Sequence, residues 1–436
     1  MIIYITLYRR AHVSGWCSGM GLSLTPIELL VMLLFTIIAS WSVYHFPIAF
    51  SGLLGFRRGR APRDDDGISH TPRVSVIVPV KNGARVLDRL MASLLSVDYP
   101  KERMEVILVE DGSTDGSYEL CKHYEKRFPE LVRVIHRERS RGKPDALSCG
   151  TSLASGEILA IFDVDSVVNP AAFKLALRHF DDPRVAAVQG RTISMNSRDS
   201  LLSWLVYLEE CWFSAMLVGR HRLNLFTPLT GSCMFIRKSS LERIGGWNCD
   251  SLTEDVELAI RLVKHDYMIV YEKEAMSFQE APTRLKHLAL QRNRWYRGYI
   301  ETLIKNLHVL KKFSLRVFDA CVLLFSPIIA LLGQIFYPLT ILAAVLISSS
   351  PLLQLILQLS LTPLIISLAA FMIAVLLLVK PREARLLLLA PMIYAYWCFL
   401  SIIALKSCAD ILTGSPRRWI TTPKEGCVWP LSQRVG

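Results

Sequence analysis

The segment EILAIFDVDS, residues 157–166, decides how the central part of this chain is interpreted. The run EILAIF has the apolar character of a buried strand, and Asp163 and Asp165 follow it directly. Aspartate is uncommon in strands, and an unpaired carboxylate is costly to bury. The two aspartates therefore mark the end of a strand, where a charged group can meet a partner or a ligand.

Apolar runs alternate with segments of helical spacing around this point. The predicted strands are VSVIVPV at 74–80, EVILVE at 105–110, VRVIH at 132–136 and EILAIF at 157–162, and the predicted helices are 84–96, 117–127 and 145–154. Strands that are apolar throughout, separated by helices, indicate an α/β fold with a parallel sheet covered on both faces. Ligands bind beyond the carboxyl ends of such strands, which is where the segments KNG, EDG and DVD lie.

Uncharged runs flank this region. No Lys, Arg, Asp or Glu occurs at residues 29–56 or 320–379, and about 20 apolar residues suffice to cross a bilayer. We expect a tail at 1–28, a transmembrane segment at 29–56, a globular domain at 72–300, basic interface helices at 284–318, three to four transmembrane helices at 320–405 and a tail at 406–436.

Basic residues predict the orientation. Arg57, Arg58, Arg60 and Arg63 follow the first span, and the positive-inside rule places them and the domain in the cytoplasm. The loop KPREAR at 380–385 and the C-terminal tail are both basic, and a span at 386–405 would separate them. Three short spans in 320–379 would place the tail inside, whereas two long ones would place the loop inside; we favour the tail. The expected location is the cell membrane, with several spans and the globular domain in the cytoplasm.

Composition excludes several classes of function. The 10 cysteines form no CxxC pair, which argues against a structural zinc site and a disulfide framework. The net charge of +12 arises partly from a basic stretch at 284–316, next to the membrane run. Such a stretch suits anionic lipid headgroups. With no nucleic-acid-binding motif present, we expect no nucleic-acid partner.

The strand ends carry plausible ligand groups. Asp163 and Asp165 could hold a hard divalent cation, Mg²⁺ or Mn²⁺, or could form a solvated turn. Asp111 could accept hydrogen bonds from a base or ribose, or could cap its own turn. Lys143 precedes a helix and could meet phosphate or base, or could be a solvated loop lysine.

Two later segments add charged groups. In LTEDVELAIRL, Thr253 is placed as an N-cap with Glu254 and Asp255 in the first turn. Acids favour helix starts, and a positioned aspartate can also act as a general base. In QRNRW, Gln291, Arg294 and Trp295 share one helix face. They could bind a diphosphate and a sugar ring, or belong to a basic interface helix with a tryptophan anchor.

In order along the chain, EDGS, GK, DVD, TED and QRNRW resemble the successive signatures of the family 2 glycosyltransferases. More narrowly, they resemble the membrane-embedded processive type, the cellulose, hyaluronan, chitin and poly-N-acetylglucosamine synthases. The resemblance covers roughly residues 72–300, with LTGSCMFIRK before GGW and WITTPKEG in the tail as further matches. EDGS replaces the commoner DDGS, and Glu110 keeps the charge.

The resemblance implies a GT-A fold and an inverting transfer from a nucleotide-sugar, commonly a UDP-sugar. Asp111 would contact the base with Lys143 nearby, Asp163 would meet the nucleotide-sugar, and Asp165 would hold a divalent metal, Mg²⁺ or Mn²⁺, on the diphosphate. Asp255 would be the catalytic base. Glu254, Gln291, Arg294 and Trp295 would frame the acceptor and the diphosphate.

The sequence is compatible with three hypotheses for the function. The preferred one is a polysaccharide synthase, with the C-terminal spans as an exit channel. The uncharged run 320–379 offers few polar groups for such a channel, namely Gln334, Gln354, Gln358 and scattered Ser and Thr, although Tyr394, Tyr396 and Trp397 could line a path. The alternative is transfer of a single sugar to a membrane lipid. A transporter or scaffold with a dead catalytic domain is disfavoured because all the expected acids and the QRNRW face are present.

Overall fold

The computed structural model describes residues 24–57, 71–306, 314–347, 350–378, 391–417 and 422–426. Several sequence-based predictions lie outside these ranges. They concern most of the N-terminal tail, Arg58, Arg60 and Arg63 after the first span, the KPREAR loop, residues 307–313 of the basic stretch and the last ten residues of the chain.

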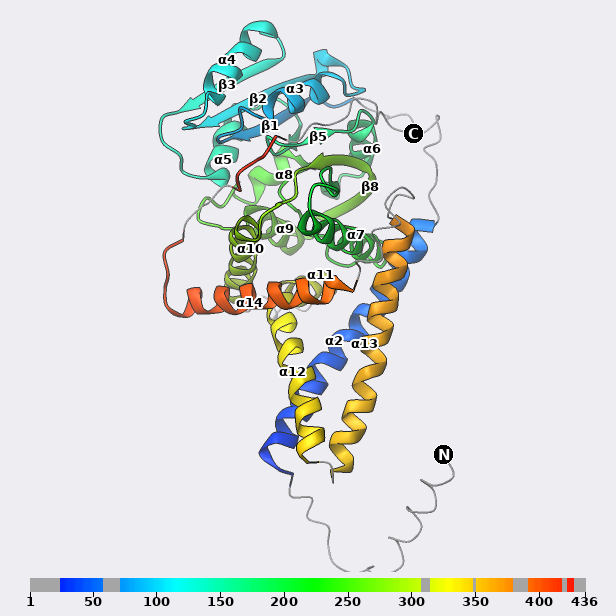
Figure 1. Cartoon of the computed structure of the whole chain (residues 1–436). Helices are drawn as coiled ribbons and strands as arrows, with labels where there is room; N and C mark the ends of the chain where they lie inside the picture. The colour runs from blue at the N-terminus through cyan, green and yellow to red at the C-terminus, as the bar shows by residue number, and fades with distance from the viewer. Residues whose placement is uncertain are drawn as a thin grey trace, which may run out of the picture.

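A single sheet organises the globular domain in the described residues, with strand order β3-β2-β1-β4-β7-β6-β8-β5 (Figure 1). Its strands are β1 (Val74–Val80), β2 (Met104–Asp111), β3 (Val132–Arg137), β4 (Ile158–Ile161), β5 (Val167–Val168), β6 (Val185–Ser194), β7 (Met234–Arg237) and β8 (Met268–Gln279). The four predicted strands are all present, and β3, β2, β1 and β4 are parallel neighbours, as expected.

The remainder of the sheet departs from the parallel pattern. β7 runs antiparallel to both β4 and β6, β8 is parallel to β6, and the short β5 is antiparallel to β8. The expectation of a parallel sheet is therefore right for one half and wrong for the other. These later strands pair across long sequence separations, which local apolar patterns do not reveal.

Helices cover both faces of the sheet, and its central strands β1 and β4 are accordingly buried along almost their whole length. The domain helices are α3 (Leu87–Leu95), α4 (Ser117–Arg127), α5 (Lys143–Leu153), α6 (Ala172–Leu177), α7 (Leu201–Arg222), α8 (Lys238–Arg243), α9 (Glu254–Lys264), α10 (Leu285–Asn306) and α11 (Leu315–Leu324), with short 3₁₀ turns at Lys101–Arg103 and Arg178–Asp181. Along β1, Val76 and Val78 join the core that contains α3 and α6. Between them, Ile77 faces the core that contains α5 and α9.

The described residues contain five helices that are long and apolar enough to cross a membrane. Four are α2 (Pro26–Arg57), α12 (Ser326–Leu346), α13 (Pro351–Leu378) and α14 (Met392–Leu412), and the fifth is α7. Two thirds of the apolar window of α7 is buried, against 17% for α2, because α7 packs inside the domain. α7 is therefore part of the globular fold.

α2, α12 and α13 form a bundle that extends away from the domain (Figure 1). Its core is largely apolar: Val31, Leu34 and Ile38 of α2 pack with Ile329, Phe336, Ala343 and Ala344 of α12 and with Leu353 and Ile356 of α13. Thr340 of α12 and Ser360 of α13 are isolated buried polar residues in these helices. α2 is joined to the domain by close backbone packing. A Cβ at Gly52 would stand 2.0 Å from the carbonyl oxygen of Ala215 in α7, so this contact requires glycine.

α14 lies across the end of the bundle nearest the domain (Figure 1). It meets the beginning of α12, where Ser401 bonds to the carbonyl of Ala330, and the end of α13, where Trp397 contacts Phe371. Its other contacts are with α10 and α7. Residues 320–378 thus hold two long apolar helices, not three short ones. Residues 422–426 of the tail contact the domain; the side of the membrane on which the tail lies stays a prediction.

Candidate active site

The carboxyl ends of β1, β2 and β4 meet at one edge of the sheet. Asn82, after β1, accepts a hydrogen bond from the amide of Thr114, after β2, at 2.9 Å. A Cβ at Gly83 would stand 2.6 Å from Val164, between the two aspartates that follow β4. The three turn segments are therefore in contact, as the parallel order of these strands requires.

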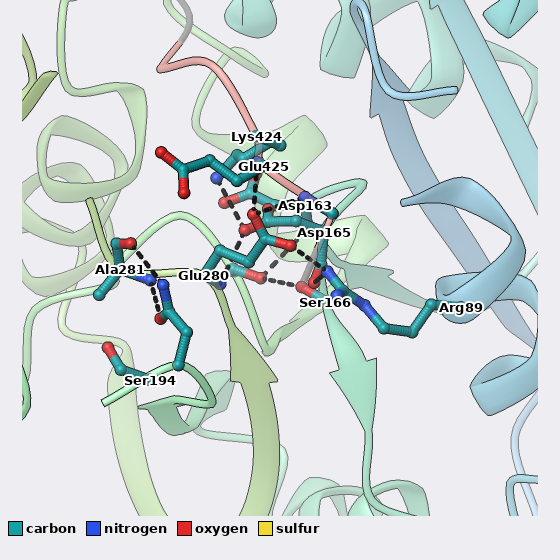
Figure 2. A network of polar contacts seen from close by, with 12 residues as sticks. Arg89, Asp163, Asp165, Ser166, Ser194, Glu280, Ala281, Lys424 and Glu425 are labelled. Carbon is teal, nitrogen blue, oxygen red and sulfur yellow. Dashed lines mark hydrogen bonds and ion pairs between the residues drawn. The ribbon is translucent and has the colours of Figure 1, made fainter. Parts of the chain in front are cut away.

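Asp165 is buried at this edge and has a cationic partner from the C-terminal tail (Figure 2). Lys424 Nζ lies 2.7 Å from Asp165 Oδ2, and the amide of Glu280 donates to the same oxygen at 3.1 Å. Burial by itself would raise the pKa of Asp165, but Lys424 and the Glu280 amide outweigh it, so the pKa lies below its usual value. Asp165 is therefore held as a carboxylate.

The surroundings of Asp165 also suit a divalent cation. Among the described residues its second oxygen, Oδ1, is buried without a hydrogen-bond partner. The described residues contain no cluster of three or more His, Cys, Asp or Glu side chains able to hold a metal. Mg²⁺ and Mn²⁺ commonly bind through one or two carboxylates together with substrate phosphates. A metal at Asp165 would thus depend on a bound diphosphate for its other ligands.

Glu280, at the end of β8, anchors the tail beside Asp165 (Figure 2). Its Oε2 accepts from the amides of Glu425 and Gly426 at 2.8 and 3.3 Å, and its Oε1 accepts from Arg89 at 3.0 Å. The tail motif WITTPKEG is visible in the sequence but indicates no role for Lys424, and nothing in the sequence points to Glu280. Both meet Asp165 through contacts that span more than 100 residues of chain.

Lys143 connects the two groups of acids in the site. It begins α5, and its Nζ donates to Asp163 Oδ1 at 2.6 Å and to the carbonyl of Gly231 at 2.7 Å. Glu254 Oε1 lies 3.8 Å from the same nitrogen. Burial would lower the pKa of Lys143, but the surrounding carboxylates, led by Asp163, raise it overall. Lys143 is therefore a permanent cation, not a solvated loop lysine.

The acids at the start of α9 have unusual protonation behaviour. Glu254 is 2% exposed, and burial raises its pKa to about 7. Burial also raises the pKa of Asp255, against the opposing charges of Lys143 and Arg294. A raised pKa in a polar cleft is typical of a group that accepts a proton during catalysis.

The predicted N-cap of this helix is in place but does not cap. Thr253 occupies the N-cap position of α9, yet its side chain makes no capping hydrogen bond. In the described part of the chain its buried hydroxyl has no partner. Gly298 of α10 packs so tightly on Thr253 that a Cβ there would stand 2.5 Å from the threonine methyl. Packing between α9 and α10 has overridden the local capping preference.

The QRNRW segment lies within α10, as predicted. Arg294 Nη1 donates to the carbonyl of Leu252, just before α9, and burial lowers the pKa of Arg294 despite the nearby acids. Gln291, one turn earlier on α10, is partly exposed. The ring of Trp295 is covered by the guanidinium of Arg292, whose carbon lies 4.3 Å from the ring centre. Arg292 in turn pairs with Glu209 of α7.

Asp111 is engaged by the loop that leads to Lys143. Its Oδ2 accepts from Ser140 Oγ at 2.5 Å and from the amide of Gly142 at 3.3 Å, and Arg137 lies 3.4 Å from Oδ1. Asp111 therefore shapes the start of α5 and so positions Lys143. The assignment of Asp111 to base recognition stays a prediction.

Comparisons with known proteins identify the family of this chain. A model of the family "Glycosyltransferase like family 2" matches residues 72–298. The probable glycosyltransferase YdaM of Bacillus subtilis is 28% identical over 280 residues, covering 63% of this chain and 67% of that protein. A beta-monoglucosyldiacylglycerol synthase of Nostoc sp. is 29% identical, with 54% and 52% covered. A poly-beta-1,6-N-acetyl-D-glucosamine synthase of Staphylococcus epidermidis is 27% identical, with 53% and 56% covered.

The chain thus spans between half and two thirds of the length of these curated relatives. Among solved structures, the mannosyltransferase PcManGT from Pyrobaculum calidifontis, in complex with GDP-Man and Mn²⁺, aligns with a TM-score of 0.56 at 20% identity. The alignment covers 88% of this chain and 100% of that one. This likeness concerns the fold and confirms the expected GT-A arrangement. The family model matches more than half of the chain, and the protein therefore belongs to the family 2 glycosyltransferases.

Proposed function

We propose that this protein transfers one hexosyl group from a nucleoside diphosphate sugar, of which a UDP-sugar is the first candidate, to a hydroxyl group of a membrane lipid. The observation that supports a transferase is the convergence on Lys143 of Asp163, Glu254 and Asp255, with Arg294 beside them. Such a cluster provides cations for a leaving diphosphate and a carboxylate for an acceptor hydroxyl.

In this reaction Asp255 removes the proton from the acceptor hydroxyl, whose oxygen attacks the anomeric carbon from the face opposite the diphosphate. The bond from that carbon to the diphosphate oxygen breaks, and the configuration inverts. Lys143 and Arg294 stabilise the charge that develops on the diphosphate. Gln291 and Trp295, on the same helix as Arg294, border the acceptor, and Glu254 tunes the charge around Lys143.

A divalent cation, Mg²⁺ or Mn²⁺, fits this proposal, because Asp165 offers a buried oxygen with no partner among the described residues. Asp165 would hold the cation, with Asp163 nearby. When bound, the cation would neutralise charge on the diphosphate. Lys424 pairs with Asp165, and we expect a bound cation to displace the Lys424 ammonium group from this carboxylate.

The acceptor is proposed to be a lipid because the helix bundle offers no polar path in its described part. The core shared by α2, α12 and α13 is largely apolar, and its buried Thr340 and Ser360 are isolated polar groups that form no continuous row. Gln334 contacts Tyr394 and Cys398 of α14, and Gln354 donates to the carbonyl of Ala344. Tyr396, once a candidate to line a channel, donates to Glu209 of α7. A sugar polymer would need unpaired polar groups along such a path, whereas a lipid needs only access from the bilayer.

We further propose that α2, α12 and α13 cross the cell membrane and that α14 lies in the membrane interface beneath the catalytic domain. This places the domain and the tail together on one side. The basic residues after α2 support the cytoplasmic side.

The deciding experiment supplies detergent-purified protein with Mn²⁺, a panel of radiolabelled nucleotide-sugars and extracted membrane lipids. A radiolabelled product that partitions into organic solvent and carries one sugar would support the proposal. A high-molecular-weight, water-soluble product would overturn the lipid acceptor in favour of a polysaccharide synthase, the preference of the sequence analysis. Asp255→Asn should abolish either product while still binding UDP, and normal turnover in that variant would remove Asp255 as the base.

A further inference from the structure

A second polar site lies on the domain away from the catalytic acids, between the end of α7 and the beginning of α11. It is a cavity of about 70 Å³. Its polar lining residues are His221, Asn224, Thr227 and Arg316, and the rest of its wall is formed by Leu225, Val263, Met268 and Ile269. None of these residues belongs to the proposed transfer site.

The cavity contains a donor that lacks an acceptor. Thr227 is 1% exposed, and among the described residues its hydroxyl has no hydrogen-bond partner. A buried polar group is normally satisfied by protein, water or ligand. Because the Thr227 side chain lines the cavity, a group bound there could supply the missing partner.

The charges at the cavity favour an anion. Arg316 stands in the first turn of α11, where backbone amides have no partners within the helix. Asn224 positions the guanidinium, since Arg316 Nη2 donates to its side-chain oxygen and Nε to its carbonyl at 3.3 Å. His221 adds a second nitrogen-bearing group at the wall.

Two acids close to the cavity, Glu272 and Asp319, are already paired. Glu272, which acts electrostatically on His221, accepts from Arg178 at 2.7 Å and from His179 at 2.8 Å. Asp319, one turn beyond Arg316 on α11, is fully buried and bonds to Arg220, Tyr44 and the amide of Phe226. Neither of these two acids bonds to Arg316, whose charge is therefore available to a ligand at this cavity.

The surroundings are those of a membrane surface. Leu315 and Phe318 flank Arg316 on α11 and are 52% and 38% exposed, and Leu223, next to Asn224, is 41% exposed. α11 leads directly into α12, one of the three bundle helices. A phospholipid carries an anionic phosphate next to its apolar chains. It therefore matches a cavity that favours an anion and lies next to exposed apolar side chains.

We propose that the cavity at His221, Asn224, Thr227 and Arg316 binds a phosphate group, supplied by the headgroup of an anionic membrane lipid. Arg316 pairs with the phosphate, and the Thr227 hydroxyl donates to one of its oxygens. The bound lipid would fix the end of α7 and the start of α11 against the bilayer. This site is independent of the proposed transfer reaction.

The test measures thermal unfolding of the full chain in a non-ionic detergent with three probes: short-chain phosphatidylglycerol, short-chain phosphatidylcholine and inorganic phosphate. We expect phosphatidylglycerol at about 100 times its Kd to raise Tm by roughly 5 °C or more. We expect no such rise with phosphatidylcholine. Added salt should weaken the effect.

Three variants assign the effect to the cavity. Arg316→Gln and Thr227→Val should each remove the Tm rise, whereas Arg222→Gln, a neighbouring arginine that bonds to Ser51 outside the cavity, should keep it. Thr227→Val preserves the shape of the side chain, so it serves if Arg316→Gln fails to fold. If the hydroxyl were merely unsatisfied, Thr227→Val would leave the rise unchanged.

The outcomes separate the sources of the phosphate. A rise with phosphatidylglycerol alone supports a lipid headgroup, and a rise with inorganic phosphate as well supports a general phosphate site. The proposal is overturned if neither phosphatidylglycerol nor inorganic phosphate raises Tm. It is also overturned if the Tm rise persists in both Arg316→Gln and Thr227→Val.

Discussion

Replacement of Glu254 by glutamine should stabilise the protein above neutral pH. Burial raises the pKa of Glu254 to about 7 from an ordinary value of 4.5, although Lys143 at 3.8 Å opposes the rise. The folded protein therefore binds this proton more tightly than the unfolded chain does. As the pH rises from 4.5 through about 7, the folded state loses stability, and above that range the loss is complete. Glutamine carries no charge at any pH and escapes the loss.

The magnitude follows from the two pKa values. A difference between 4.5 and about 7, at about 1.4 kcal/mol per pH unit, gives an upper bound of roughly 3 kcal/mol. For a domain of this size, each kcal/mol changes Tm by about 2–4 °C. We therefore expect Glu254→Gln to raise Tm by roughly 5–10 °C at about pH 8.5, and by little at about pH 5, where Glu254 is largely protonated in the folded state.

The assay is intrinsic tryptophan fluorescence during heating of the detergent-purified protein, without donor or metal. Glu257→Gln is the matched control, because Glu257 lies one turn further along α9 and pairs with Arg261 at 2.8 Å. It should lower Tm slightly at both pH values. The reasoning is refuted if the Tm difference between Glu254→Gln and the unmodified protein is the same at both pH values, or if the variant is less stable at the higher one.

Three further predictions concern the transfer site. Asp165→Asn should abolish the Mn²⁺-dependent part of UDP binding in calorimetry, and an unchanged metal dependence would place the metal elsewhere. Lys424→Gln should strengthen Mn²⁺ binding in the absence of donor, roughly tenfold or about 1.4 kcal/mol, because it removes the cation 2.7 Å from Asp165; weaker Mn²⁺ binding would contradict this. Gly231→Ala should lower kcat about tenfold or more, since Gly231 has φ +81° and a Cβ would stand 3.0 Å from Asp255 and 3.2 Å from Lys143; an unaltered kcat would show that these groups tolerate displacement.

Many of the helices and strands can be predicted from local patterns in the sequence. The helix at Ser117–Arg127 and the strand at Val74–Val80 have the predicted bounds, because each buries a continuous apolar stripe or run that is legible within a few residues. Asp163 follows its strand for the same local reason, and the order of the parallel strands brings it next to the turn after β1. The long apolar helices are also a local property of composition.

The tertiary structure decided what depends on distant partners. β7 lies antiparallel between β4 and β6 in the sheet. Thr253 packs against Gly298 and makes no capping hydrogen bond. α14 lies across the bundle, although its composition is that of a membrane-spanning helix. Lys424 reaches Asp165 across 259 residues of chain. Sequence alone determines which segments become helices and strands, because that choice follows from neighbours in the chain. Which side chains share a site follows from backbone pairing and burial over the whole fold, where the interactions of each segment with distant ones outweigh its own preferences.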